Sequence, residues 1–244
     1  MKQLFEYNFN NGLNTKAVQV RDWQELPQAL QLLGFTRSYS TLVLVGGAGK
    51  ISESDYALVQ KIFLRILAPL AESLQITVVD GGTDTGIMRL MGKARASIEG
   101  TFPLLGVAAY GTVVTPGLMT FNRDAACLDP YHTHFVLVPG HRWGDESQWL
   151  ARIPSIISET SPSVTLVING GEITWHDINF SVREGRPTLI LAGSGGTADQ
   201  IAAALREELC DAPTDTLISS GLIQAINIQH THQLEQSLRD CFKH

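Results

Sequence analysis

The chain has 244 residues, which is enough for one large α/β domain or two small ones. Hydrophobic residues make up 44% of it and charged residues 17%, so it can build a core, and its net charge of −6 makes a nucleic-acid-binding surface unexpected. We expect a cytoplasmic protein without membrane insertion, because the first ten residues lack the apolar centre of a signal peptide and no run of about 18 apolar residues is present. Cys127, Cys210 and Cys241 are too far apart to predict a disulfide framework or a cysteine zinc site, which fits a reducing cytosol.

The first half of the chain alternates short apolar strands with helical stretches. The run TLVLVGGAG closes on glycines and is typical of parallel strands that are buried on both faces. A long helix connects it to the next strand, which predicts a right-handed βαβ unit. In chain order, we predict strands at 4–9 and 17–20, a helix at 23–33, a strand at 41–49, a helix at 53–74, a strand at 76–79, a helix that begins after residues 83–85, and a strand at 103–110.

The second half repeats this alternation after a long irregular stretch. Residues 112–133 are rich in Pro, Gly, Asn and Asp, and a loop of that length inside a compact domain is often functional. Residues 216–229 do not favour one kind of element. In chain order, the remaining predictions are a strand at 135–138, a helix at 146–158, a strand at 164–168, a helix near 172–183, a strand at 188–192, and helices at 198–209 and 232–243.

The alternation predicts an α/β fold: an open, mainly parallel sheet with helices on both faces. No linker, repeat or low-complexity segment divides the sequence, so we predict a single domain over residues 1–244. In such sheets, ligands bind outside the carboxyl ends of the strands. The glycine turns after the strands at 42–45, 76–79, 164–168 and 188–192 should therefore meet at one edge.

Two of these turns, GGTDTG at 81–86 and GSGGTAD at 193–199, are candidate phosphate-binding loops. Glycines let the backbone approach an anion, and the start of the following helix adds free N–H groups and positive potential. Neither loop is a P-loop, because no Gly-Lys-Ser/Thr ending follows, and ordinary turns between strands and helices also contain glycine. The predicted ligand-binding residues of the four turns are Gly46, Gly47, Gly81, Gly82, Thr83, Asp84, Thr85, Asn169, Gly170, Gly193, Ser194, Gly195, Gly196 and Thr197.

Other residues near this edge are candidates for contacts to a ligand. His132 and His134 have a spacing that could hold a metal ion, but further ligands are missing, so we predict polar contacts from His132, Thr133 and His134 and no metal. Guanidinium groups pair well with phosphate, and aromatic rings stack on bases. The candidates for those contacts are Arg123, Arg89, Arg142, Tyr110 and Trp143.

A catalytic site is less clear from the residues. No Gly-x-Ser-x-Gly nucleophile motif and no Cys–His pairing is present. A buried carboxylate at the predicted edge could act as a base, although several of these positions also suit helix caps and turns. The carboxylates near that edge are Asp80, Asp84, Asp129 and Asp199, of which Asp84 and Asp199 are the candidate acid or base.

Four segments occur in the order found in one known family. They are VVDGGTDTGIMRLMG at 78–92, GVAAYGTV at 106–113, LDPYHTHFVLVPG at 128–140 and LILAGSGGTADQIA at 189–202. Over about residues 40–202, the chain resembles the cytosolic amino-terminal homology region of TRPM cation channels and its prokaryotic relatives. That region is a branch of the SLOG superfamily and is similar to the Rossmann-like LOG/DprA fold.

The resemblance implies a Rossmann-like domain that binds nucleotide-derived ligands, since this region binds ADP-ribose in some TRPM channels. By position, the loops at 81–86, 110–111, 132–134 and 193–197 would line the pocket, which adds Gly111 to the predicted site. The phosphoribohydrolase relatives carry Pro-Gly-Gly-x-Gly-Thr and a following glutamate. Here Gly193 to Thr197 keep the glycines and threonine, but no glutamate follows, which weakens the enzyme interpretation.

Three hypotheses follow. The first is a cytosolic binding or sensing domain for ADP-ribose, NAD or a related nucleotide, without a further cofactor, which passes its signal to a separate effector protein because no transmembrane segment is present. The second is an enzyme that cleaves an N-glycosidic bond in such a nucleotide through Asp84 or Asp199. The third is a non-catalytic interaction subunit. The resemblance also implies a homo-oligomer.

Overall fold

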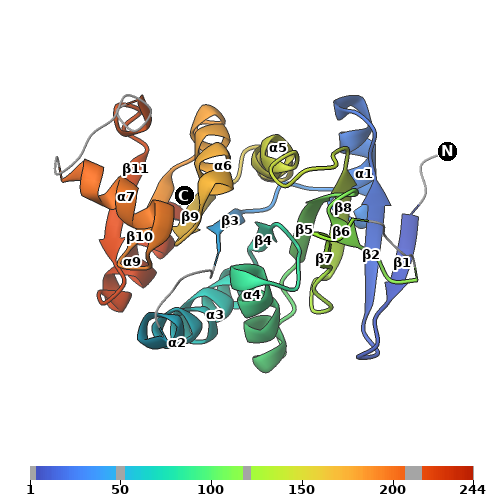
Figure 1. Ribbon diagram of the computed structural model, residues 1–244, viewed down its shortest axis with the longest axis horizontal. Helices are drawn as coiled ribbons and strands as arrows, with labels where there is room; N and C mark the ends of the chain where they lie inside the picture. The colour runs from blue at the N-terminus through green and yellow to red at the C-terminus, as the bar shows by residue number, and fades with distance from the viewer. Residues whose placement is uncertain (1–3, 48–52, 118–121, 207–215, 244) are drawn as a thin grey trace.

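The computed structural model describes residues 4–47, 53–117, 122–206 and 216–243. Its centre is a sheet in which nine of the described strands are hydrogen-bonded side by side (Figure 1). These strands are β1 (Leu4–Asn8), β2 (Asn14–Gln19), β3 (Thr41–Gly46), β4 (Thr77–Asp80), β5 (Leu104–Ala109), β8 (His134–Val138), β9 (Ser163–Ile168), β10 (Thr188–Ala192) and β11 (Ile223–Asn227). Their order across the sheet is β1-β2-β8-β5-β4-β3-β9-β10-β11.

The sheet is parallel except at one edge, where β1 pairs antiparallel with β2. The chain proceeds from β3 through β4, β5 and β8 in one direction, and then crosses to β9, β10 and β11 on the other side of β3. Strand order therefore reverses between β3 and β9, the kind of position at which α/β folds bind ligands. The predicted fold class, a Rossmann-like and mainly parallel sheet, is confirmed.

Helices cover both faces of the sheet, as predicted (Figure 1). One face carries α2 (Glu53–Ile62), η2 (Phe63–Leu67), α3 (Ala68–Leu74), α4 (Gly86–Ser97) and α9 (Thr231–Cys241). The other carries η1 (Trp23–Glu25), α1 (Leu26–Leu33), α5 (Ser147–Ser158), α6 (Glu172–Arg183) and α7 (Gly196–Leu205). In the described part of the chain, no helix is both long enough and apolar enough to cross a bilayer.

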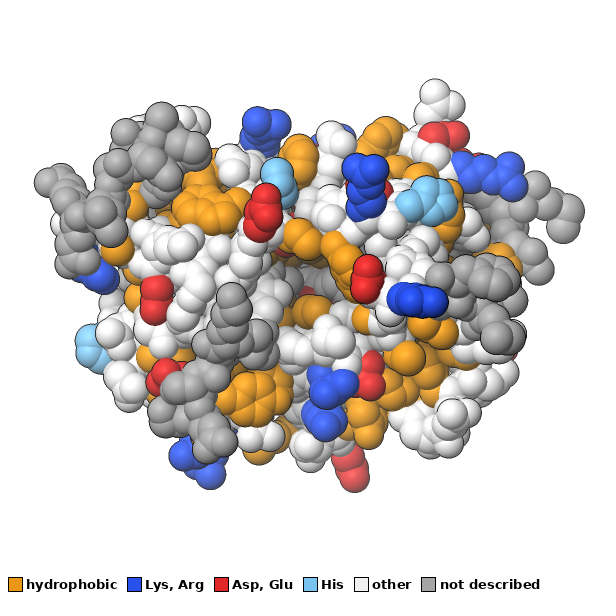
Figure 2. Space-filling model, viewed as in Figure 1, with side chains coloured by type: hydrophobic (Ala, Val, Ile, Leu, Met, Phe, Trp, Pro, Cys, Tyr) orange, Lys and Arg blue, Asp and Glu red, His pale blue; other side chains and the backbone are white. Residues whose placement is uncertain are grey.

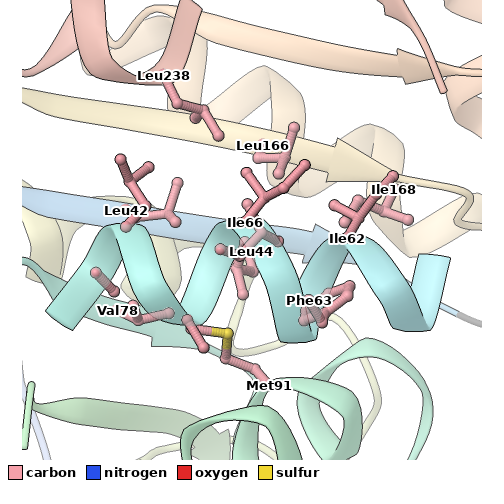
Figure 3. Close-up of a cluster of buried hydrophobic side chains, with 14 of the residues drawn as sticks. Leu42, Leu44, Ile62, Phe63, Ile66, Val78, Met91, Leu166, Ile168 and Leu238 are labelled. Atoms are coloured by element: carbon pink, nitrogen blue, oxygen red, sulfur yellow. The ribbon is translucent and has the colours of Figure 1, made fainter. Parts of the chain in front are cut away.

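The core follows from the alternation of side chains along buried strands. Leu42 and Leu44 of β3 pack with the helices α2 to α4 (Figure 3), whereas Val43 and Val45 pack on the opposite face. All four side chains are at most 2% exposed. The unbroken apolar run from Leu42 to Val45 is therefore the consequence of helices on both sides of β3.

The predicted helix at 53–74 forms as one run that changes geometry in its middle. Residues 63–67 form the π-helix η2 between α2 and α3. Pro69, in the first turn of α3, has no N–H to donate to the carbonyl four residues earlier, so one helical hydrogen bond is missing at the junction of η2 and α3. The wider turn at η2 accommodates this missing bond.

Three predictions differ from the structure in detail. Residues 223–227, which favoured no element, form the edge strand β11, and α7 begins at Gly196 rather than at residue 198. The loop 112–133 contains two short paired strands, β6 (Val113–Val114) and β7 (Ala126–Cys127). The predicted strand end at 48–49, the predicted helix end at 207–209 and Cys210 lie outside the described residues.

Candidate functional site

A cavity of about 630 Å³ opens at the carboxyl ends of the strands, where β3 and β9 adjoin. Its wall combines the ends of β3, β5 and β9 with the loop after β4 and the first turns of α5, α6 and α7. Its size falls within the range of small-molecule sites, about 300–1,000 Å³. The lining residues are Leu44, Val45, Gly46, Gly47, Gly81, Thr83, Met88, Ala108, Thr112, Trp143, Glu146, Leu150, Asn169, Gly170, Gly171, Glu172, Ile173, Thr174, Asp177 and Gly196.

The structure brings all four predicted glycine turns to this one cavity. The turn after β3 and the turn after β9 face each other across the reversal in strand order, and the two candidate phosphate loops complete the rim. Of the predicted ligand-binding residues, those that line the cavity are Gly46, Gly47, Gly81, Thr83, Asn169, Gly170 and Gly196.

The turns after β9 and β10 interlock. The backbone N–H of Thr197 donates to the Gly170 carbonyl at 3.1 Å, and the Thr197 hydroxyl donates to the Gly171 carbonyl at 2.9 Å. A Cβ at Gly196, whose φ is +57°, would lie 2.2 Å from the Gly170 carbonyl oxygen. Gly196 is therefore required for the close approach of these two turns, in addition to any contact with a ligand.

The first turn of α6 opens onto the cavity. Gly171 is its N-cap and exchanges two hydrogen bonds with Thr174, one from each backbone N–H, at 3.1 and 3.2 Å. Glu172 and Ile173, the first two helical residues, carry N–H groups that have no acceptor within the helix. A Cβ at Gly171 would meet nothing within 4 Å, so its backbone is accessible. Such a helix start is suited to an anion.

Where α5 and α6 pack together, the cavity wall is acidic, in contrast to the anion-binding start of α6. Glu146, the N-cap of α5, and Asp177 of α6 both line the cavity and are each only 9% exposed. Burial raises the pKa of Glu146. Burial also raises the pKa of Asp177 to about 7; the Ser147 hydroxyl opposes this shift, and the charge of Glu146 adds to it. This end of the cavity therefore presents two carboxyl groups whose pKa values are raised by burial, that of Asp177 to about 7.

Among the residues that the structure describes, no basic side chain lines the cavity beside these acids. Of the described lining residues, Glu146, Glu172 and Asp177 are acidic and none is Lys or Arg. Arg123 and Arg142 are exposed and do not line it, and Arg89 is engaged with Asp84 at 2.7 Å. On the face visible in Figure 2, the Lys and Arg side chains are scattered among acidic side chains and form no continuous basic patch. A phosphate here would depend on backbone N–H groups and the helix start.

The structure places His132 in a buried network and not at the cavity. Its Nε2 lies 2.8 Å from Asp80 Oδ1 and its Nδ1 lies 2.7 Å from Asp129 Oδ2, with all three side chains fully buried. Burial opposes the charged imidazole, but the two carboxylates outweigh burial and raise its pKa to about 9. Burial also raises the pKa of Asp129. His132 has no ring nitrogen left for a ligand, and the described residues contain no group of three metal-binding side chains.

Several other predicted residues also lie away from the cavity. The hydroxyl of Thr133 bonds the backbone of Leu104, and His134 is the first residue of β8, so both lie at the start of that strand and not at its carboxyl end. Burial, together with Lys16 and Arg95, lowers the pKa of His134 to about 4.

Tyr110 and Gly111 pack against His141 instead of lining the cavity. The Tyr110 ring meets the His141 ring edge-on at 5.3 Å, and a Cβ at Gly111 would lie 2.5 Å from His141 Nδ1. Of the aromatic candidates for base stacking, Trp143 lines the cavity and Tyr110 does not.

The remaining predicted residues do not face the cavity, and several of them pack against the glycine turns or form hydrogen bonds within them. The space beside Gly82 is filled by Gly106 and Phe135, and Thr85 is the exposed N-cap of α4. Ser194 is buried and accepts the backbone N–H of Asn169 at 2.7 Å, while Asp199 accepts that of Gly193 at 2.6 Å. Predicted residues that do not line the cavity are Gly82, Asp84, Thr85, Tyr110, Gly111, Arg123, His132, Thr133, His134, Gly193, Ser194, Gly195 and Thr197.

The sequence interpretation also missed lining residues. Gly171, Glu172 and Thr174 directly follow the predicted turn Asn169-Gly170, so the predicted helix start was an available signal. Glu146 and Asp177 belong to no motif, since they come from two helices that only the fold brings together.

Comparisons with known proteins identify a family and several proteins that this chain resembles. Residues 39–236 match the model of a protein family described as SLOG in TRPM, prokaryote. Transient receptor potential cation channel subfamily M member 2 is 29% identical in the mouse, over 77% of this chain and 14% of the channel. The rat protein of the same name is 28% identical, over 67% of this chain and 13% of the channel. The fruit-fly channel trpm is 26% identical, over 96% of this chain and 14% of its own length.

The chain thus spans about one seventh of the length of these relatives. Among solved structures, that of the structural genomics target TM1055 superposes with a TM-score of 0.55 at 19% identity, and the match covers 82% of this chain and 99% of that one. At this identity, the likeness supports the fold and nothing more specific.

Proposed function

This chain belongs to the family described as SLOG in TRPM, prokaryote, and from that membership and its cavity we propose that it binds a nucleotide-derived ligand such as ADP-ribose or NAD. The ligand lies outside the carboxyl ends of β3 and β9, with its phosphates on the glycine turns and the start of α6. The domain acts by binding or sensing this ligand, and ligand binding is transmitted to a separate partner protein.

One observation carries this proposal. Four glycine turns that are distant in the sequence converge on a single cavity at the reversal of strand order. The start of α6 supplies N–H groups at its rim, so a phosphate can bind there without a nearby cation. The cavity volume suits a small organic molecule.

Binding is favoured over hydrolysis by the positions of the two candidate catalytic carboxylates. Asp84 pairs with Arg89, Asp199 closes its own turn on Gly193, and neither lines the cavity. A general acid or base must reach the reacting bond through a hydrogen bond or one water. We therefore expect no turnover of NAD that depends on Asp84 or Asp199, which chromatography of NAD incubated with the Asp84→Asn and Asp199→Asn variants would check.

Isothermal titration calorimetry of the full chain tests the proposal. The probes are ADP-ribose, NAD, cyclic ADP-ribose and AMP, each up to millimolar concentration. We expect saturable binding of at least one of them with a stoichiometry of one per chain. Absence of binding for all four would overturn the proposal.

A pair of substitutions at Gly171 locates the phosphate. Asn and Asp both suit this N-cap position, have nearly the same shape, and find open space there. Gly171→Asp adds a negative charge at the rim, so it should weaken ADP-ribose binding about ten-fold more than Gly171→Asn does. Equal affinities of the two variants would show that no phosphate lies at the start of α6. Their melting temperatures check that both are folded.

A further inference from the structure

The strongest unexplained feature of the cavity is a buried carboxylate oxygen. Asp177 is 9% exposed and lines the cavity, and its Oδ1 forms no regular hydrogen bond among the described residues, although the buried Ser147 hydroxyl lies close enough to lower its pKa. A buried polar atom is nearly always hydrogen-bonded, and leaving one unpaired is costly. A carboxylate oxygen is an acceptor, so the group that completes this site must bring a donor.

A second carboxyl group faces the same cavity from the neighbouring helix. Glu146 lies at the start of α5, which packs beside α6 (Figure 1), and its two oxygens accept the Gly144 N–H at 3.1 and 3.0 Å. Each carboxylate oxygen has more than one lone pair, so Glu146 retains capacity to accept. Two carboxyl groups at one end of a cavity are matched by a ligand with two adjacent donors. The vicinal hydroxyls of a ribose have that arrangement.

The position of the acid that commonly binds a ribose in dinucleotide-binding folds does not line the cavity here. In such folds, an Asp or Glu that follows the glycine-rich turn by about 20 residues binds the ribose hydroxyl. The acid at the end of β4, the strand beside β3, is Asp80. It is fully buried and does not line the cavity; its Oδ1 contacts both His132 Nε2 and the Gly82 N–H, at 2.8 and 2.7 Å, and its Oδ2 has no hydrogen-bond partner among the described residues. Hydroxyl recognition must therefore come from another wall of the cavity.

We propose that Glu146 and Asp177 bind the vicinal hydroxyls of a ribose in the ligand. This inference rests on the proposed function. It orients the nucleotide, with phosphate at the start of α6 and ribose toward the interface of α5 and α6. Asp177 lies five residues after Glu172, or about 7.5 Å along the helix axis, a spacing that a ribose 5-phosphate can bridge. The acidic side chains then contact the uncharged part of the ligand.

Calorimetry with trimmed ligands tests the inference. The probes are ADP-ribose, ADP-ribose without the adenosine 2′-hydroxyl, and ADP, which has no terminal ribose. The native protein should bind one of the two trimmed probes more weakly than ADP-ribose: about ten-fold for the probe without the 2′-hydroxyl, which loses one hydrogen bond to a charged group, or more than ten-fold for ADP, which loses both vicinal hydroxyls. Asp177→Ala and Glu146→Ala should bind that trimmed probe and ADP-ribose with nearly equal affinity. Asp177→Asn, which keeps the side-chain shape, should lie in between.

The matched control is Glu172→Gln, which removes a negative charge from the same cavity but leaves the two carboxyl groups in place. It should shift the affinity of all three probes by a common factor. If the native protein binds ADP-ribose and the substitutions at Asp177 and Glu146 change all three affinities equally, the inference is overturned while the proposed function stands. If the native protein does not bind ADP-ribose, AMP, NAD or cyclic ADP-ribose, both fail together.

Discussion

His132 shows how one side chain can suggest a ligand contact in the sequence and serve another purpose in the fold. It is held between Asp80 and Asp129, and a Cβ at Gly92 of α4 would lie 2.2 Å from Asp129 Oδ2. The network therefore fixes α4 and the loop before β8 to the end of β4. Because the three side chains are fully buried, each depends on the charges of the other two.

This network predicts a specific dependence of stability on pH. The pKa of His132 is raised from 6.5 to about 9 in the folded protein. A raised pKa contributes stability that is fully present below pH 6.5 and is lost as pH rises through about 9. We expect the free energy of unfolding from urea titrations to fall by a few kcal/mol across that window.

The double variant Asp80→Asn/Asp129→Asn keeps the shapes of both partners and removes their charges. Its unfolding free energy should lose most of this decline between pH 6.5 and 9. His176→Asn, at an exposed histidine of α6, is the matched control and should retain the decline. An equally steep decline in the double variant would contradict a charged His132.

The sequence predicts the site residues unevenly, and the reason is physical. Glycine turns after buried strands were found because the strand pattern and the turn are local signals, and Gly46, Gly81, Gly170 and Gly196 do line the cavity. The acids of the cavity have no local signal, since Asp177 lies within a helix. His132 could not be told from a ligand contact because its two carboxylate partners come from different segments.

Among the elements, the pairing of β3 with β9 positions the cavity. Gly46, the last residue of β3, has a φ of +128°, and a Cβ there would lie 2.0 Å from the Ile168 carbonyl oxygen of β9. The Gly47 N–H donates to that same carbonyl at 3.1 Å. The two strands thus stay paired up to the edge at which the turns diverge.

Gly46→Ala should therefore destabilise the protein through two effects. The left-handed conformation costs about 1–2 kcal/mol for a residue with a Cβ, and the clash with β9 adds roughly 1–3 kcal/mol. Gly185→Ala separates the conformational cost from the clash, because Gly185 has a φ of +71° but no atom within 4 Å of an added Cβ. Urea midpoints should show the larger loss for Gly46→Ala. Equal losses would mean that the β3–β9 contact is not tight.

Most elements could be predicted because apolar strands and amphipathic helices alternate clearly. Two features could not. β11 is an edge strand with the sequence IQAIN, whose two polar residues gave no continuous apolar run. The π-helical turn η2 lies just before Pro69, but the helix pattern at 53–74 does not reveal how the chain accommodates the missing hydrogen bond.

Taken as a whole, the molecule uses strand order to assemble a site from distant segments. The turns after β3, β4, β9 and β10 are separated by up to about 150 residues in a chain of 244, yet they share one cavity. With net charge −6 and no basic side chain among the described lining residues, the described part of this site can bind phosphate through backbone N–H groups and through hydroxyl and amide side chains. The account therefore depends on the position of the phosphates relative to the glycine turns.

A crystal structure of the full chain grown with ADP-ribose measures that position directly. The account predicts the pyrophosphate within hydrogen-bond distance of backbone N–H groups at the start of α6 or in the glycine turns, and a ribose beside Glu146 and Asp177. A nucleotide bound on another face of the molecule, or one inside the cavity with its phosphates directed away from every one of these turns, would contradict it.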